Sequence, residues 1–79
     1  MPKFFFHLYN DLDVPDQEGE EFASLEEANA SARFQALALA SELLRDDARL
    51  VLHHRIDIED AHGAVLSSVR FGDVVTVEN

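Results

Sequence analysis

The chain has 79 residues and no cysteine, and its 16 Asp and Glu against 6 Lys and Arg give a formal net charge of -10. The lack of cysteine excludes disulfides, thiolate metal sites and cysteine nucleophiles. The acidity argues against nucleic-acid and anionic-membrane partners, because both are bound through clustered Lys and Arg. We treat residues 1–79 as a single domain, and one this small buries only about 60% of its unfolded surface, so we expect association to supply added stability.

The first predicted element is a β-strand over Lys3–Tyr9, an aromatic run with high strand propensity. Alternation divides it into an even-numbered face, Phe4, Phe6 and Leu8, and an odd-numbered face, Phe5, His7 and Tyr9. A single helix can cover only one face of a sheet. We expect the even-numbered face to meet the helix and the odd-numbered face to find another cover.

A loop and a short strand follow. Asn10–Gln17 combines Asn, Asp and Pro in turn-favouring order and is predicted as the loop of a first hairpin. Its aspartates match two positions of an EF-hand loop, but Phe22 stands where that loop needs its last glutamate, so we expect no metal site here. In the predicted strand Glu18–Phe22, Gly19 indicates a bulge or a close backbone approach.

The longest predicted element is a helix from Ser24 to about Arg45. Ser24 and Glu27 form the S-x-x-E capping box of a helix start. At helical spacing, a core stripe collects on one side: Leu25, Ala28, Ala32, Ala36, Leu39, Ala40 and Leu43. The alanines in its middle indicate close packing on a sheet that carries large side chains.

A second apolar stripe lies more than a quarter-turn away on the same helix: Phe34, Leu37 and Leu44, with Ala30 and Ala48. A helix that serves one core normally carries charge opposite its apolar face, so we expect something to cover this stripe. Either the tail of the chain or the run Leu50–Leu52 folds over Phe34, or a partner subunit does, since contiguous exposed apolar patches mark interfaces.

Two further strands are predicted after the helix. Leu50–Glu59 ends in the alternation of a half-buried strand, and Asp60–Gly63 forms a tight turn. Ala64–Phe71 returns beside it, with Val65, Val69 and Phe71 on one side, and Val74–Val77 is the candidate for a last edge strand. The order β-β-α-β-β predicts an α+β fold, an antiparallel sheet of four or five strands with one long helix on one face.

The opening Met-Pro-Lys-Phe-Phe-Phe-His, the Asp16-x-Glu18-Gly19 motif, the Ala-rich helix and the run from Arg55 to Phe71 together resemble a family of small alphaproteobacterial proteins catalogued as a domain of unknown function. The resemblance covers nearly the whole chain, and the aromatic-His and D-x-E-G motifs are its most specific parts. It implies a small bacterial α+β protein, and it carries over no catalytic residue. A weaker similarity, at the helix start, to the partial ribonuclease-H-like domains of certain antitoxins is an analogy of fold.

Histidine chemistry is the main catalytic alternative. His7 lies between Phe5 and Tyr9, where an imidazole oriented by a carboxylate could serve as a general base or a ligand. Such a histidine is more often structural, held by a neighbour or at an interface. His53 and His54 are adjacent on the presumed strand and point to opposite faces, so they do not readily chelate one metal.

We therefore expect a non-enzymatic interaction module, a homodimer or an adaptor, without cofactor or metal. Its candidate contact residues are Phe34, Leu37 and Leu44 on the helix and Phe5, His7 and Tyr9 on the sheet. The alternatives are a small-ligand binder or minor enzyme built on His7, and an antitoxin-like partial ribonuclease-H-type domain. The sequence shows no signal-peptide pattern and no apolar run near the roughly 18 residues that span a bilayer, so we expect a cytoplasmic protein.

Overall fold

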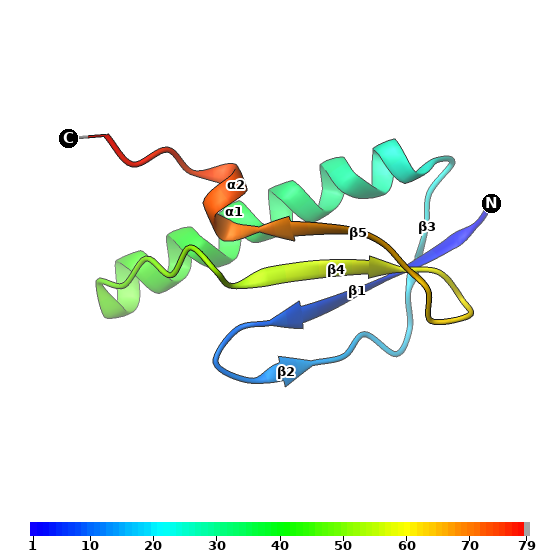
Figure 1. Ribbon diagram of the computed structural model, residues 1–79, viewed down its shortest axis with the longest axis horizontal. Helices are drawn as coiled ribbons and strands as arrows, with labels where there is room; N and C mark the ends of the chain where they lie inside the picture. The colour runs from blue at the N-terminus through cyan, green and yellow to red at the C-terminus, as the bar shows by residue number, and fades with distance from the viewer. Residues whose placement is uncertain (79) are drawn as a thin grey trace.

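The computed structural model describes residues 1–78 and has one long helix and a small antiparallel sheet (Figure 1). In chain order the elements are β1 (Lys3–Tyr9), β2 (Asp13–Val14), β3 (Glu20–Glu21), α1 (Leu25–Asp47), β4 (Arg55–Glu59), β5 (Val65–Arg70) and α2 (Phe71–Val74). The strand order is β2-β1-β4-β5, and β3 pairs separately with β1. The predicted α+β fold is confirmed.

Strand β1 is the centre of the sheet. It pairs antiparallel with β4 along five residues, from Phe5 opposite Glu59 to Tyr9 opposite Arg55. Its two ends pair with the short strands, the C-terminal end with β2 and the N-terminal end with β3. The strand expected over Glu18–Phe22 is therefore only two residues long, because the chain between β2 and β3 leaves the ladder.

Helix α1 begins as the capping box predicts. Ser24 Oγ accepts the N–H of Glu27 at 3.2 Å, and Glu27 Oε2 accepts the N–H of Ala23 at 3.1 Å. The helix ends two residues later than expected, at Asp47, where Ala48 takes a left-handed φ of 54° and donates its N–H to Leu44 O. Two acidic residues thus remain at a helix C-terminus, where the macrodipole disfavours negative charge.

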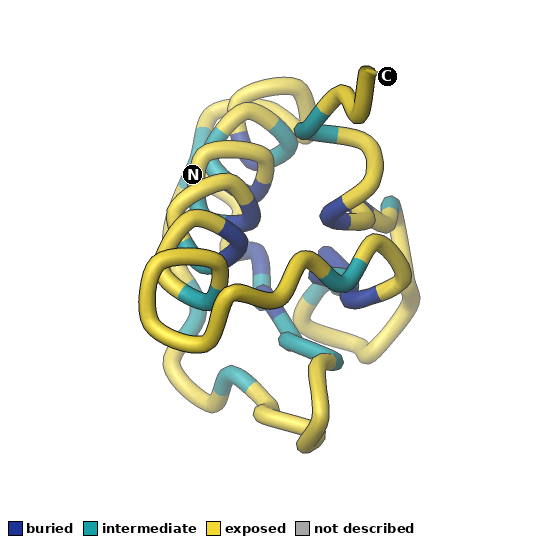
Figure 2. Tube along the Cα trace, turned by 90° about the vertical axis from the view of Figure 1, so that its left-hand side faces the viewer, coloured by how far each residue is buried: buried dark blue, intermediate teal, exposed yellow. Residues whose placement is uncertain are grey.

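The core is a layer of alanines packed on larger side chains. One side of α1 contributes four buried alanines, which are Ala28, Ala32, Ala36 and Ala40. The strands β1, β4 and β5 and the helix α2 contribute the larger side chains, which are Phe4, Phe6, Ile56, Ile58, Val69 and Phe71. In Figure 2 the dark buried positions of the helix face those of the strands. The expectation that the even-numbered face of β1 meets α1 is confirmed, with Leu8 partly buried at its margin. Leu25 was expected in the core stripe, but it is 36% exposed at the first turn of the helix.

In the C-terminal third, one predicted strand forms over only half of its expected length and another is wrong. The strand expected over Leu50–Glu59 begins only at Arg55, because the carbonyls of Leu52 and His54 accept the N–H groups of Gly72 and Phe71 at 3.0 and 2.7 Å. The edge strand expected over Val74–Val77 is absent from the described part of the chain. There the chain turns into α2, whose start is closed by a 2.9 Å bond from the N–H of Arg70 to Asp73 Oδ2.

A β-bulge in β5 changes which of its residues face the helix. Ile58 pairs with Ser67 while the next residue, Glu59, pairs with Val65, so β5 carries one extra residue at this point. Val65 was expected beside Val69 on the helix side, but the bulge turns it outward and it is 56% exposed. The Asp60–Gly63 turn forms as expected, with Gly63 at a φ of 84°.

Among residues 1–78, no helix combines the length and the apolar character that crossing a bilayer requires.

Candidate functional site

The second apolar stripe of α1 lies in the open. Phe34 is 75% exposed, Leu37 44% and Leu44 50%, so the three predicted contact residues share one uncovered face. The expectation that the tail of the chain or Leu50–Leu52 folds over Phe34 is wrong for the described residues, because Phe34 remains 75% exposed. Within residues 1–78 the stripe is therefore only partly covered, and the expected partner subunit is the alternative that remains.

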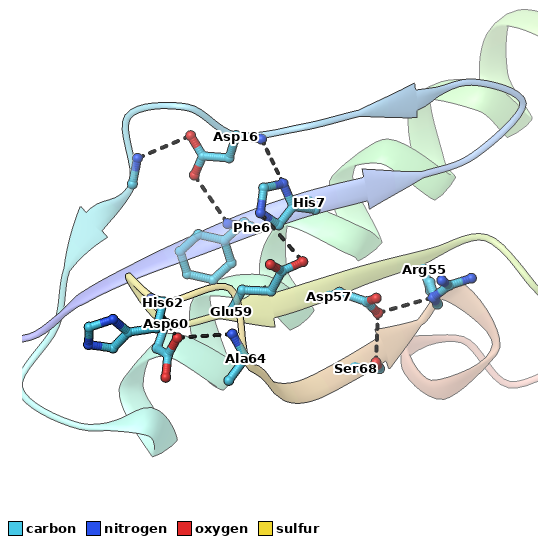
Figure 3. Close-up of polar contacts among 11 residues, drawn as sticks. Phe6, His7, Asp16, Arg55, Asp57, Glu59, Asp60, His62, Ala64 and Ser68 are labelled. Carbon is cyan, nitrogen blue, oxygen red and sulfur yellow. Dashed lines mark hydrogen bonds and ion pairs between the residues drawn. The ribbon is translucent and has the colours of Figure 1, made fainter.

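The odd-numbered face of β1 is different, because its three predicted contact residues are all half-buried. His7 is held on both sides of its ring (Figure 3). Its Nδ1 accepts the N–H of Asp16 at 3.0 Å, and its Nε2 lies 3.5 Å from Glu59 Oε2. Since Nδ1 is the acceptor, the neutral ring carries its proton on Nε2. His7 therefore has no free nitrogen with which to take a proton from a substrate, and this geometry supports a structural role.

Asp16 closes the gap between β2 and β3. Its Oδ2 accepts the N–H of Phe6 at 3.1 Å, and its Oδ1 accepts the N–H groups of Glu18 and Gly19, each at 3.1 Å. Partial burial alone would raise the pKa of this carboxyl, but the three N–H donors together outweigh burial and the pKa lies below its ordinary value of 3.8. The carboxylate stands in for the backbone acceptor that an unbroken edge strand would offer to Phe6.

Gly19 is required by the same turn. It has a φ of +71°, and a Cβ built on it would lie 2.8 Å from Lys3 Cγ and 2.9 Å from Phe5 Cε1. The D-x-E-G motif and the aromatic-His motif thus meet in space, since Phe5 covers Gly19 and His7 binds Asp16. The two motifs that carry the family resemblance therefore form one structural unit, and these contacts account for their residues without a catalytic role.

Beside His7, the outer sheet face carries a group of polar side chains that pair with one another. Asp57, which is only 6% exposed, accepts hydrogen bonds from Arg55 Nε at 3.0 Å and Ser68 Oγ at 2.6 Å (Figure 3). The guanidinium carbon of Arg55 lies 4.3 Å from the centroid of the Tyr9 ring, within cation–π range. Tyr9 is therefore covered by its own chain, and this face is a weaker candidate for a contact surface than the stripe on α1.

A hollow of about 120 Å³ lies at the edge of this face. It is lined by His7, Leu8, Tyr9, Asp13, Val14 and Pro15. The ligand-binding alternative needs His7 in a pocket with a carboxylate that orients it. Glu59, which faces the Nε2 of His7, does not line this hollow.

A larger hollow of about 230 Å³, which was not predicted from the sequence, lies at the C-terminal end of α1. It is lined by Asn10, Asp11, Leu39, Glu42, Leu43, Asp46, Asp47, His54 and Phe71. His54 is buried, at 3% exposure, and its ring meets Phe71 edge-on with centroids 5.5 Å apart. Asp46 and Asp47, two acidic residues at a helix C-terminus, were the sign of this site in the sequence. Only the fold shows that they share a hollow with His54.

The carboxylates around this hollow differ in their partners. Asp11 Oδ2 lies 3.3 Å from Arg49 Nη1, and Asp46 Oδ1 lies 3.3 Å from Arg45 Nε. The hydrogen bond and charge of Arg49 hold the pKa of Asp11 below its ordinary value. Within residues 1–78, no three His, Asp or Glu side chains are grouped so that they could hold a metal ion.

Comparison with known proteins adds a family and no activity. A family model described as Domain of unknown function (DUF6894) matches residues 3–72. Neither a curated protein nor a solved structure matches the chain. The comparisons therefore lend no support to the similarity with ribonuclease-H-like antitoxin domains.

Proposed function

The chain belongs to the family of the domain of unknown function DUF6894, and from that premise we propose that it is a non-enzymatic interaction module that acts as a homodimer. The observation that carries the proposal is the open apolar stripe on α1, whose Phe34 is 75% exposed. Contiguous exposed apolar surface on a small protein marks a contact site. The half-buried, internally paired outer face of the sheet offers no comparable surface.

The spacing of the stripe favours another helix as its cover. Six exposed positions of α1 and its cap alternate at intervals of four and three residues: Ala30, Phe34, Leu37, Ser41, Leu44 and Ala48. This is the spacing of a coiled-coil seam, in which side chains of one helix fit between those of a second helix crossing at about 20°. We call these six positions the α1 seam.

A second copy of the chain fits the seam best in an antiparallel arrangement. When the two seams are centred on each other, Phe34 of one copy faces Leu44 of the second copy. Large side chains then meet across the interface. It also brings Arg33, which flanks the seam, near Asp47 of the second copy, whereas a parallel pair brings neither residue near an opposite charge. Opposed helix macrodipoles add to this preference. The proposal includes a bacterial cytoplasmic setting, supported by the family resemblance and the cysteine-free, acidic composition.

Sedimentation of the full chain at micromolar concentration tests the proposal. We expect a dimer that Phe34→Glu converts to a monomer with unchanged helix content, because a charge in the seam cannot be buried without a partner. Leu12→Glu is the matched control, since Leu12 is 74% exposed and lies outside α1.

A strict monomer at all concentrations rules out the homodimer. A dimer that persists in both Phe34→Glu and Leu44→Glu places the interface elsewhere. A monomer that captures a different protein through the seam supports an adaptor role in place of the homodimer.

A further inference from the structure

The hollow at the end of α1 contains a buried histidine with unused hydrogen-bonding capacity. His54 is 3% exposed, and neither ring nitrogen has a hydrogen-bond partner within residues 1–78. Its Nε2 lies 3.5 Å from Asp11 Oδ1, at the outer limit of hydrogen-bond distance, so Asp11 offers it at most a weak contact, and Nδ1 has no such neighbour. Because buried polar side-chain atoms in folded proteins are nearly always paired, a buried imidazole with an unpaired nitrogen at a hollow has hydrogen-bonding capacity that a ligand can use.

The charge around the hollow defines the sign of that ligand. Four carboxylates line it: Asp11, Glu42, Asp46 and Asp47. The C-terminal end of α1 adds the negative pole of the helix macrodipole. Arg49 and Arg45 each pair with one of the four, and no Lys or Arg among residues 1–78 lies within ion-pair distance of Glu42 or Asp47. The hollow therefore favours a cation.

Its other lining residues define the kind of cation. Leu39, Leu43 and Phe71 give the hollow an apolar wall, which a bare metal ion does not use. The acidic side chains also lack the grouping that a metal ion needs. A short aliphatic chain with an ammonium group uses both the apolar wall and the carboxylates. The carboxylates come from two separate elements, with Asp11 on the loop after β1 and the others on α1, which suits a ligand charged at both ends.

We propose that this hollow is a binding site for a short aliphatic diamine. One ammonium group donates hydrogen bonds to the unprotonated ring nitrogen of His54 and to Asp11. The methylene chain packs on Leu39, Leu43 and Phe71, and the second ammonium group meets the carboxylates of α1. Asp47 also flanks the α1 seam, where the proposed homodimer would bring Arg33 of the second copy close to it, but the other lining residues lie outside the seam. The site therefore does not require a homodimer.

The test is titration of the full chain with 1,4-diaminobutane, followed by isothermal calorimetry and by amide and imidazole NMR shifts. We expect one saturable site, with the shift changes concentrated at His54, Asn10 and Leu43. The equally long but uncharged 1,4-butanediol is expected not to bind. The double variant Asp46→Asn with Asp47→Asn is expected to weaken binding by about tenfold or more, because it removes two of the charges at the site. His54→Phe, which keeps the ring volume, is expected to abolish saturable binding.

The matched control is Glu20→Gln with Glu21→Gln, which removes two charges from β3 and is expected to leave the affinity unchanged. Equal weakening in both double variants would show general attraction to an acidic chain and overturn the site. Binding of Zn²⁺ or Mg²⁺ that depends on His54, with no diamine binding, would overturn the ligand class. The Asp46, Asp47 variant changes only exposed side chains, so it keeps the test decisive if His54→Phe fails to fold.

Discussion

The backbone N–H of Asp16 donates a hydrogen bond to Nδ1 of His7 across 3.0 Å, which ties the edge of the sheet to its central strand. Asp16 in turn holds the N–H of Phe6 through its own carboxylate. The aromatic-His and D-x-E-G motifs are thus two halves of one clamp. Residues that looked like candidates for chemistry instead stabilise a strand edge that is interrupted between β2 and β3.

Asp16→Ala is expected to lower the free energy of unfolding by about 1–3 kcal/mol, the usual cost of leaving a buried or half-buried donor without its partner. The substitution removes the acceptor of three backbone N–H groups. Urea denaturation followed by circular dichroism measures the change. The control is Asp13→Ala in β2, where we expect a change within about 0.5 kcal/mol. Equal effects of the two variants would contradict the clamp.

The contribution of Asp16 to stability is also expected to depend on pH. Its pKa in the folded chain lies below the ordinary value of 3.8, so its carboxylate form is favoured by folding. The stabilisation is then complete above 3.8 and is lost as the pH falls through the lower folded-state pKa. We expect the stability difference between the natural chain and Asp16→Asn to shrink over that acidic range. A difference that stays constant from pH 7 down to the acid limit would refute the assignment.

Gly19→Ala is expected to destabilise the fold more than Gly63→Ala. Both glycines have positive φ, at +71° and +84°, so each alanine incurs the left-handed penalty of about 1–2 kcal/mol. At Gly19 the new Cβ also meets the side chains of Lys3 and Phe5 below 3.0 Å, while at Gly63 the nearest atom is 4.0 Å away. Thermal unfolding of the two variants gives the comparison. Equal loss in both would mean that contact at Gly19 contributes nothing beyond backbone strain.

Enlarging the alanine layer of α1 is expected to disrupt packing. Ala32 is 0% exposed, so Ala32→Leu overfills the space against the sheet and is expected to cost about 1–3 kcal/mol. Ala38→Leu adds the same atoms at an exposed position of the same helix and is expected to be nearly neutral. The urea concentration at the midpoint of unfolding measures the change in stability for both variants. A neutral Ala32→Leu would show that the helix does not pack closely on the strands.

The proposed homodimer is expected to tighten as salt rises or as the pH falls toward the sequence pI near 4.5, because two chains of charge -10 then repel each other less. Going from about 0.02 M to about 0.5 M salt shortens the screening length from roughly 20 Å to roughly 4 Å. Sedimentation equilibrium across that range measures the dissociation constant. A constant that responds to neither salt nor pH would show that charge repulsion has no part in assembly.

Local pattern was sufficient for the main elements of the fold. The capping box at Ser24, the alternation in Lys3–Tyr9 and the alanine spacing of the helix each report a contact made within a few residues. These predicted the helix start, the buried face of β1 and the α+β order. The same periodicity on α1 predicted a second stripe that the core does not use, and Phe34, Leu37 and Leu44 are indeed exposed.

Contacts between distant residues decided the rest. The β5 bulge that turns Val65 outward, the late start of β4 and the turn into α2 all depend on which backbone groups find partners across the fold. The sequence by itself determined where the apolar stripes and the acidic charge lie. Only the tertiary structure decided that His7 is held by Asp16 and that His54 shares a hollow with Asp11 from the other end of the chain. Periodicity records which way a side chain points along its own element, whereas a site is made by elements that meet after the chain has folded.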